Sequence, residues 1–159
     1  MTKLLEVVFA FIGTVGFGVL FGVAKKHLIH CGITGGLGWL IYLIAFYFSH
    51  SPYTTTLISA FAITRISRYL SVRRKTPATV FLLTGIFTLV PGAGVYYTAF
   101  YLFLNQTELG YENLMSTLKI ALAISIGIVL GYAVKEDIAG IIKRKINKNK
   151  EIAKIQPEK

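Results

Sequence analysis

The stretch best suited to chemistry runs from Val90 to Thr98, inside a long apolar segment. Pro91 removes a backbone donor and clashes with the preceding helical turn, while glycines adopt backbone angles that other residues avoid, so a helix is predicted to break here. A half-helix from about Gly94 to Leu104 then directs its positive dipole end and free N–H groups at the break, which suits a carboxylate. The candidate substrate-binding residues of this stretch are Pro91, Gly92, Gly94, Tyr96, Tyr97 and Thr98.

The break also has a simpler interpretation. Proline kinks are common in membrane helices, and many only shape the packing of neighbouring helices. Two glycines, a cluster of hydroxyl groups and the excess length of the segment favour a binding role. Thr84 and Thr88 lie before the break, where their hydroxyls either bond freed carbonyls or pack between helices.

Ionisable side chains are sparse in the apolar segments. Arg65 and Arg68 lie one helical turn apart, where they either reach lipid phosphates or guide an anionic substrate; both are candidate substrate-binding residues. Glu6 is the one acid within the apolar runs, and it lies near an end where water is within reach. An ionisable group within a membrane helix is a functional candidate.

No set of residues indicates catalysis. His27, His30 and Cys31 have a helical spacing that a metal site can use, but ordinary hydrogen bonding near the interface fits them better. The sequence contains no recognisable nucleophile with its base, no paired catalytic acids and no phosphate-binding loop. We therefore expect no enzyme, no cofactor and no metal.

Composition identifies the environment in which these residues work. Of the 159 residues, 54% are apolar and 15% are charged, with a mean hydropathy of +0.63; soluble domains average about 45–50% and about 25%. So much apolar surface excludes disorder, and the single cysteine excludes a disulfide framework. The net charge of +10 alone suggests a nucleic-acid binder, but its distribution indicates membrane topology, so no nucleic-acid partner is expected.

The apolar runs predict an all-α, polytopic integral membrane protein with five transmembrane helices. A helix needs about 20 apolar residues to cross the hydrocarbon layer of the bilayer. The first run lacks the basic start and cleavage site of a secretory signal, so we expect it to be retained as a span. The predicted spans are residues 4–23, 28–48, 54–69, 77–104 and 116–134, with the fourth broken at Pro91–Gly94.

The positions of the cations predict the orientation. Fifteen of the 17 Lys and Arg residues lie between spans one and two, from the end of span three to the start of span four, or after span five. Cytoplasmic loops retain positive charge, so the N-terminus is expected outside and the C-terminus inside. The 28 residues of the fourth run make about 42 Å of helix. A re-entrant hairpin there would place the tail cations outside, so a single interrupted span is preferred.

The predicted organisation has two parts. Residues 1–134 form the transmembrane bundle, and residues 135–159 form a basic amphipathic cytoplasmic tail that lies on the membrane or docks on a partner's soluble domain. Gly-x-x-x-Gly pairs allow close helix contact, either within the chain or with a partner subunit. These pairs are Gly18 with Gly22, Gly32 with Gly36, and Gly127 with Gly131.

The stretch from Lys75 to Phe81, followed by Leu89 to Gly94 and Tyr96 to Thr98, resembles the threonine/serine exporter family. More closely, the chain looks like the small membrane subunit of the two-component version, equivalent to the C-terminal half of the fused exporters. The resemblance implies a multi-pass subunit in the cell membrane that exports small amino acids or carboxylates, such as threonine, serine or succinate. It also implies a larger partner subunit that contributes the complementary membrane half.

Two positions depart from the family pattern. Thr84 and Thr88 stand where the family often has prolines, and Arg68 stands near a position where a carboxylate is frequent, so no proton-coupling role is carried over to it. Two other functions stay open. The chain either self-associates into a homo-oligomeric channel or transporter, or it is a non-transporting membrane scaffold in which the break is structural.

Overall fold

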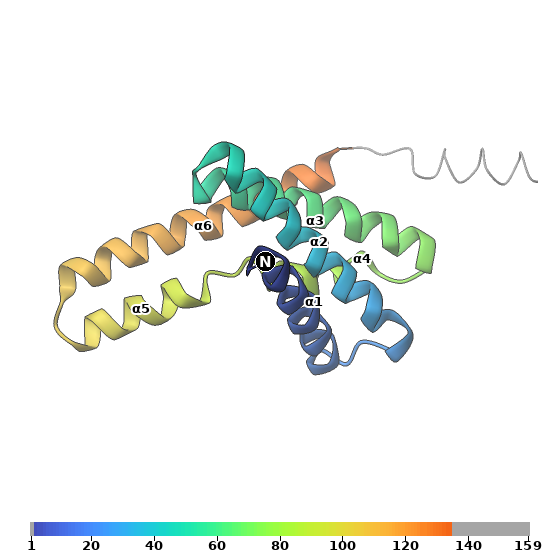
Figure 1. Ribbon diagram of the computed structural model, residues 1–159, viewed down its shortest axis with the longest axis horizontal. Coiled ribbons are helices and arrows are strands. Elements are labelled where there is room, and N and C mark those ends of the chain that lie inside the picture. Colours follow the sequence, from blue (N-terminus) through green and yellow to red (C-terminus); the bar gives the residue numbers. More distant parts are fainter. Residues whose placement is uncertain (1, 135–159) are drawn as a thin grey trace, which may run out of the picture.

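The computed structural model describes residues 2–134, which form six α-helices and no strand (Figure 1). The all-helical class predicted from the sequence is confirmed for this part of the chain. The predicted basic tail, residues 135–159, lies outside the described residues. The helices are α1 (Thr2–Leu20), α2 (Lys25–Ser49), α3 (Pro52–Arg74), α4 (Ala78–Ile86), α5 (Gly92–Phe103) and α6 (Thr107–Ala133).

Left-handed residues at the helix ends fold the chain into hairpins. After α1, Gly22 has a φ of +67°, and the N–H of Val23 bonds back to the Gly18 carbonyl at 2.9 Å, as in a Schellman motif. Asn105, with a φ of +57°, makes the corresponding turn between α5 and α6. Each turn reverses the chain within a few residues, so α2 packs on α1 and α6 packs on α5.

α3 is the central helix of the described residues. It packs against α2, α4 and α6, and its buried side includes Ser59, Ile63 and Thr64, none of which is exposed. The Ser59 hydroxyl donates to the Gly38 carbonyl of α2 at 2.6 Å, and the Thr64 hydroxyl donates to the Ala60 carbonyl at 2.8 Å. These two buried hydroxyls of α3 are therefore satisfied inside the protein, whereas that of Ser67 is buried without a partner among the described residues.

Three of the described helices, α1, α2 and α6, are long and apolar enough to cross a membrane. α3 has sufficient length, but its hydroxyl and guanidinium groups lower its hydropathy. α4 and α5 have 9 and 12 residues; at 1.5 Å per residue they reach about 14 and about 18 Å, short of the hydrocarbon thickness of about 30 Å. The five-span count and the N-outside orientation stay predictions.

Two helices extend at least five residues beyond one end of their predicted spans. α3 continues to Arg74 instead of ending near Tyr69, because arginine is a good helix former and does not interrupt the backbone hydrogen bonds. α6 begins at Thr107 rather than Ser116. The acidic residue in its first turn, Glu108, complements the positive end of the helix dipole. The helix therefore includes the charged residues that precede the apolar run.

Glycines bring neighbouring helices into close contact. A Cβ atom at Gly35 would overlap Thr14 of α1, and one at Gly127 would lie 2.6 Å from the Leu57 carbonyl oxygen of α3. Gly22 instead serves the turn after α1, with no atom near its Cβ position. The glycines of the predicted pairs in tight contacts within the chain are Gly18, Gly32, Gly127 and Gly131.

The two halves of the interrupted fourth span lie in different surroundings. α4 packs against α1, α2 and α3, whereas α5 packs against α6. In Figure 1, α5 and the adjoining half of α6 extend to one side, away from α1, α2 and α4. The break between α4 and α5 therefore lies where this hairpin leaves the rest of the fold.

Candidate functional site

The predicted interruption of the fourth span is present, but it begins earlier than the sequence indicates. Residues 87–91 separate α4 from α5, whereas the break was expected at Pro91–Gly94. α5 starts at Gly92, so both glycines of the motif are helical. The physical reason lies before the glycines. Tight turns, such as the bond of 2.8 Å from the Leu89 N–H to the Ile86 carbonyl, end α4, and Pro91 disfavours helical angles in the residue before it.

The start of α5 presents backbone donors at the break. The first four N–H groups of a helix have no partner within that helix. Here the Gly92 N–H bonds to the Val90 carbonyl at 2.8 Å, and the Val95 N–H bonds to the Pro91 carbonyl at 3.1 Å. The N–H groups of Ala93 and Gly94, which lie between these two residues, are the donors that α5 offers to another acceptor.

The hydroxyl side chains of α5 point in different directions. Tyr96 and Tyr97 are 62% and 47% exposed, and their rings contact each other at 5.4 Å. Thr98 is buried, and its hydroxyl donates to the Gly94 carbonyl at 2.7 Å. Gly94 packs against Thr117 of α6, so the first turn of α5 has one side on α6 and two tyrosines on its exposed surface.

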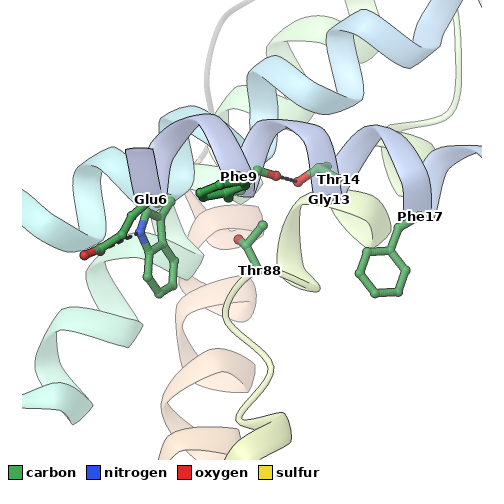
Figure 2. A pocket seen from close by; sticks show the side chains of 8 residues that line it. Glu6, Phe9, Gly13, Thr14, Phe17 and Thr88 are labelled. Atoms are coloured by element: carbon green, nitrogen blue, oxygen red, sulfur yellow. Dashed lines mark hydrogen bonds between the residues drawn. The ribbon is translucent and has the colours of Figure 1, made fainter. Parts of the chain in front are cut away.

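A cleft of about 370 Å³ lies beside the break (Figure 2). Its volume falls within the range of about 300–1,000 Å³ typical of ligand sites. Figure 2 shows the Thr88 side chain, which comes from the break, directed toward α1. None of the eight predicted substrate-binding residues lines this cleft. The lining residues are Glu6, Phe9, Ala10, Gly13, Thr14, Phe17, Trp39 and Thr88.

A carboxylate lies at one end of the cleft. The Trp39 Nε1–H of α2 donates to Oε2 of Glu6 on α1 at 3.3 Å, and the indole stacks on Tyr42 with ring centroids 5.0 Å apart. Glu6 was a candidate from the sequence, whereas Trp39 was not. Trp39 could have been found because both residues lie in apolar segments, and a tryptophan N–H inside a protein usually has a hydrogen-bond partner.

The side chains of Arg65 and Arg68, both on α3, contact the C-terminal end of α6. Nη1 of Arg65 donates to the Val134 carbonyl at 2.8 Å, and Nη1 of Arg68 donates to the Val134 and Gly131 carbonyls at 3.0 and 3.1 Å. The Arg68 guanidinium also lies 5.5 Å from the centre of the Tyr132 ring. Because the last carbonyls of a helix carry partial negative charge, the arginine pair caps α6.

The structure does not bring the arginine pair together with the start of α5. Gly94 of α5 packs against Thr117 of α6, whereas Arg68 binds Gly131, 14 residues further along that helix. At 1.5 Å per residue, this separation is about 21 Å along the helix axis. The predicted substrate-binding residues therefore fall into two places, one at the break and one at the C-terminal end of α6.

The histidines and the cysteine lie near the start of α2. His27 shares a hydrogen bond of 3.1 Å between its Nε2 and the Thr76 hydroxyl, and Cys31 is fully buried as a free thiol. Within residues 2–134, no three His, Cys, Asp or Glu side chains gather around a common point. His27 contributes here to the contact between α2 and the segment after α3.

Comparison with known proteins identifies a related family. The family model described as "Threonine/Serine exporter, ThrE" matches residues 6–134 of the chain. This range contains the cleft, the break, α5 and both arginines. No solved structure matches the chain.

Proposed function

The chain belongs to the threonine/serine exporter family, and from this premise we propose that it is one subunit of a secondary transporter that exports small amino acids or carboxylates across the cell membrane. Membership makes the chain an amino-acid-exporter-type transporter protein, and three long apolar helices fit a membrane protein. The proposal adds the substrate class, the binding site and the need for a partner.

The observation that supports this proposal best is the break beside a cleft. Non-helical backbone within hydrocarbon costs several kcal/mol for each unpaired group, so it is stable only where protein or a water-filled cavity covers it. Residues 87–91 interrupt the fourth predicted span, and Thr88 of this segment lines the cleft. In secondary transporters, broken helices of this kind form substrate sites near the middle of the membrane.

The proposed carboxylate site is the N-terminal turn of α5. Pro91 ends the preceding segment, and Gly92 leaves the start of α5 without a covering side chain, whereas Gly94 packs against Thr117 of α6. The helix dipole favours an anion at this end. A Cβ atom at Gly92 would meet no other atom within 4 Å, so a small ligand has space to approach there.

The hydroxyl groups of α5 are proposed to complete this site. Tyr96 and Tyr97 stand on the exposed side of the helix, where their hydroxyls are accessible to a substrate held between α5 and a neighbouring subunit. Thr98 donates to the Gly94 carbonyl and thereby stabilises the first turn of α5. Its proposed contribution is to the shape of the site.

Arg65 and Arg68 are proposed to act at the approach to the transporter. The guanidinium groups keep their positive charge while they bond to the carbonyls of α6. With the C-terminus inside, this end of α6 faces the cytoplasm, where two cations attract an anionic group before it reaches the break.

A larger partner subunit is proposed to cover the exposed face of α5 and to contribute the complementary membrane half. α5 packs against α6, and its other side exposes large apolar residues such as Val95 and Phe103. An odd number of spans in each half gives the two halves opposite orientations, as in inverted-repeat transporters. The lipid bilayer covers the remaining apolar surface.

Substitution at Gly92 tests the site without disturbing the fold. Because the space at Gly92 is open, Gly92→Leu is expected to leave membrane insertion and the amount of protein unchanged while reducing export of threonine or serine at least about tenfold. Gly16 is a matched control, since it is helical and equally open but lies on α1 outside the cleft. Gly16→Leu is expected to leave export within about twofold of the original chain.

The partner is tested in the same cells. Export of threonine, serine and succinate is followed when this chain is expressed with and without the larger subunit. Export is expected only with both subunits. Full export by this chain alone would contradict the need for a partner and favour a homo-oligomer. Equal export by the original chain and by Gly92→Leu would mean that the break only shapes helix packing.

A further inference from the structure

The side-chain donors of the cleft are already used within the protein. The Trp39 Nε1–H donates to Glu6 at 3.3 Å, and the Thr88 hydroxyl donates to a carbonyl of its own turn at 2.8 Å. The Thr14 hydroxyl is fully buried and donates to the Ala10 carbonyl at 2.6 Å. The cleft therefore offers only acceptors to a ligand, namely the Glu6 carboxylate and the lone pairs of the Thr88 oxygen. A ligand that hydrogen-bonds there must be a donor.

The charge of Glu6 has no counter-ion among residues 2–134. Its one hydrogen bond in this part of the chain comes from Trp39 and reaches Oε2, which leaves Oε1 for another donor. Lys3 lies one turn earlier on α1 but lines a different groove, beside Tyr47. Glu6 is exposed at this end of the cleft, so a cation can reach its carboxylate there.

We propose that Glu6 is the ammonium-binding residue of the transporter. The α-ammonium group of an exported amino acid donates to the Glu6 oxygen that Trp39 leaves free, and Trp39 is a positioning residue that holds the carboxylate in the cleft. This inference rests on the proposed export function. Because the ammonium and carboxylate groups of an α-amino acid are attached to the same carbon, binding of the ammonium group at Glu6 is a separate step from binding of the carboxylate at α5.

The location of Glu6 gives this residue a role in selectivity. The lining of the cleft extends along α1 from Glu6 to Phe17, about 16 Å at 1.5 Å per residue. With the N-terminus outside, Glu6 lies at the outer end of the cleft, on the release side. A carboxylate at that point repels a dicarboxylate and attracts an amino acid, so the same residue favours threonine or serine over succinate.

Binding is measured through Trp39, which is the only tryptophan in the chain. The purified full-length chain, which carries the eight lining residues, is studied in lipid nanodiscs. Tryptophan fluorescence is titrated with L-serine, with ethanolamine, which keeps the ammonium group and lacks the carboxylate, and with glycerate, which has a hydroxyl in place of the ammonium group. Serine and ethanolamine are expected to change the emission, and glycerate is not.

The variant Glu6→Gln keeps an acceptor for Trp39 and removes the negative charge. It is expected to fold, as checked by circular dichroism, and to bind serine at least about tenfold more weakly. The matched control is Glu108→Gln, which neutralises an exposed acid in the first turn of α6, away from the cleft. This control is expected to bind serine with unchanged affinity.

A second pair of variants tests the cleft by export. Gly13 lines the cleft and has open space at its Cβ position, so Gly13→Leu fills the cleft without displacing another helix. Gly13→Leu is expected to lower serine export at least about tenfold, whereas Gly16→Leu, which is equally open but outside the cleft, is not.

Three outcomes overturn the ammonium site. They are a response to glycerate equal to that of serine, no response to serine, and unchanged serine affinity in Glu6→Gln. If the Trp39 emission changes with pH but not with serine, and this pH dependence is absent in Glu6→Gln, Glu6 is a proton-binding group instead. Loss of the serine response in Glu6→Gln without any export by the two-subunit transporter refutes the export function but not the site. Export by Glu6→Gln at the original rate and selectivity refutes the site but not the export function.

Discussion

The two halves of the interrupted helix are both apolar, yet they are held in opposite ways. α4 packs against α1, α2 and α3, and its Phe81 side chain is completely buried. α5 packs against α6, and Phe103 near its end is 87% exposed. The break at residues 87–91 thus joins a half-helix fixed in the fold to one that still has a free apolar face.

This difference supports the places proposed for the partner and for the substrate. A buried half-helix provides a fixed reference for the cleft, since Thr88 follows α4 directly and lines the cleft with residues of α1. An exposed half-helix in a membrane is covered by lipid or by another protein. Breaks in transporter helices lie where rigid and moving parts meet, which fits the proposed two-half arrangement.

The largest expected effect is the loss of stability when the buried ring of α4 is removed, and removal of an exposed ring of α5 is the comparison. Phe81→Ala leaves a cavity inside the fold and is expected to lower the free energy of unfolding by about 3 kcal/mol or more. Phe103→Ala removes an exposed ring and is expected to change it by less than about 0.5 kcal/mol. Unfolding by sodium dodecyl sulfate in mixed micelles measures both values for the isolated chain.

The same pair also tests whether α5 is covered by a partner. When the larger subunit is present, Phe103→Ala is expected to weaken the association of the two subunits, whereas in the isolated chain it has little effect. Similar losses of stability for both variants in the isolated chain would contradict the distinction between a fixed α4 and an exposed α5.

The sequence predicts the fold well where hydrophobicity alone determines it. α1, α2 and α6 are recognisable as apolar runs, and Pro91 marks the interruption. The sequence was less informative for α3, because its hydroxyl groups lower the hydropathy although several of them are bonded to carbonyls inside the fold, as Ser59 is to Gly38. Hydrogen bonds between helices are not visible in composition, so a buried polar helix resembles a weak span.

The candidate site was harder to predict than the fold. The motif pointed to α5, but the cleft joins Thr88 to residues of α1 and α2, and Trp39 is 33 positions from its partner Glu6. Contacts at such distances along the chain depend on helix packing, which one sequence does not specify. The arginines illustrate the same limit, because the α6 carbonyls that they cap are more than 60 residues away.

A smaller effect is expected at the other end of the α5–α6 hairpin. Arg68 ties the end of α6 to α3 through several carbonyls. Arg68→Gln is expected to lower the free energy of unfolding by about 1–2 kcal/mol and to speed hydrogen exchange in the last turn of α6. Arg68→Lys keeps the charge without the planar fork. If charge guides the substrate, the lysine variant retains export although its stability falls; if capping alone matters, export falls with stability in both.

The smallest effect compares two turns, one beside each half of the interrupted helix. Lys75, before α4, and Asn105, after α5, both adopt left-handed backbone angles, with φ values of +52° and +57°. Asparagine tolerates this conformation and lysine does so poorly. Lys75→Gly is therefore expected to stabilise the fold by about 0.5–1 kcal/mol, and Asn105→Gly to change its stability by less than about 0.5 kcal/mol. Unfolding in mixed micelles measures both. If Asn105→Gly stabilises the fold more than Lys75→Gly does, the backbone strain lies in the exposed α5–α6 hairpin. The isolated chain is then less stable at α5 because the shape of this helix is adapted to another surface.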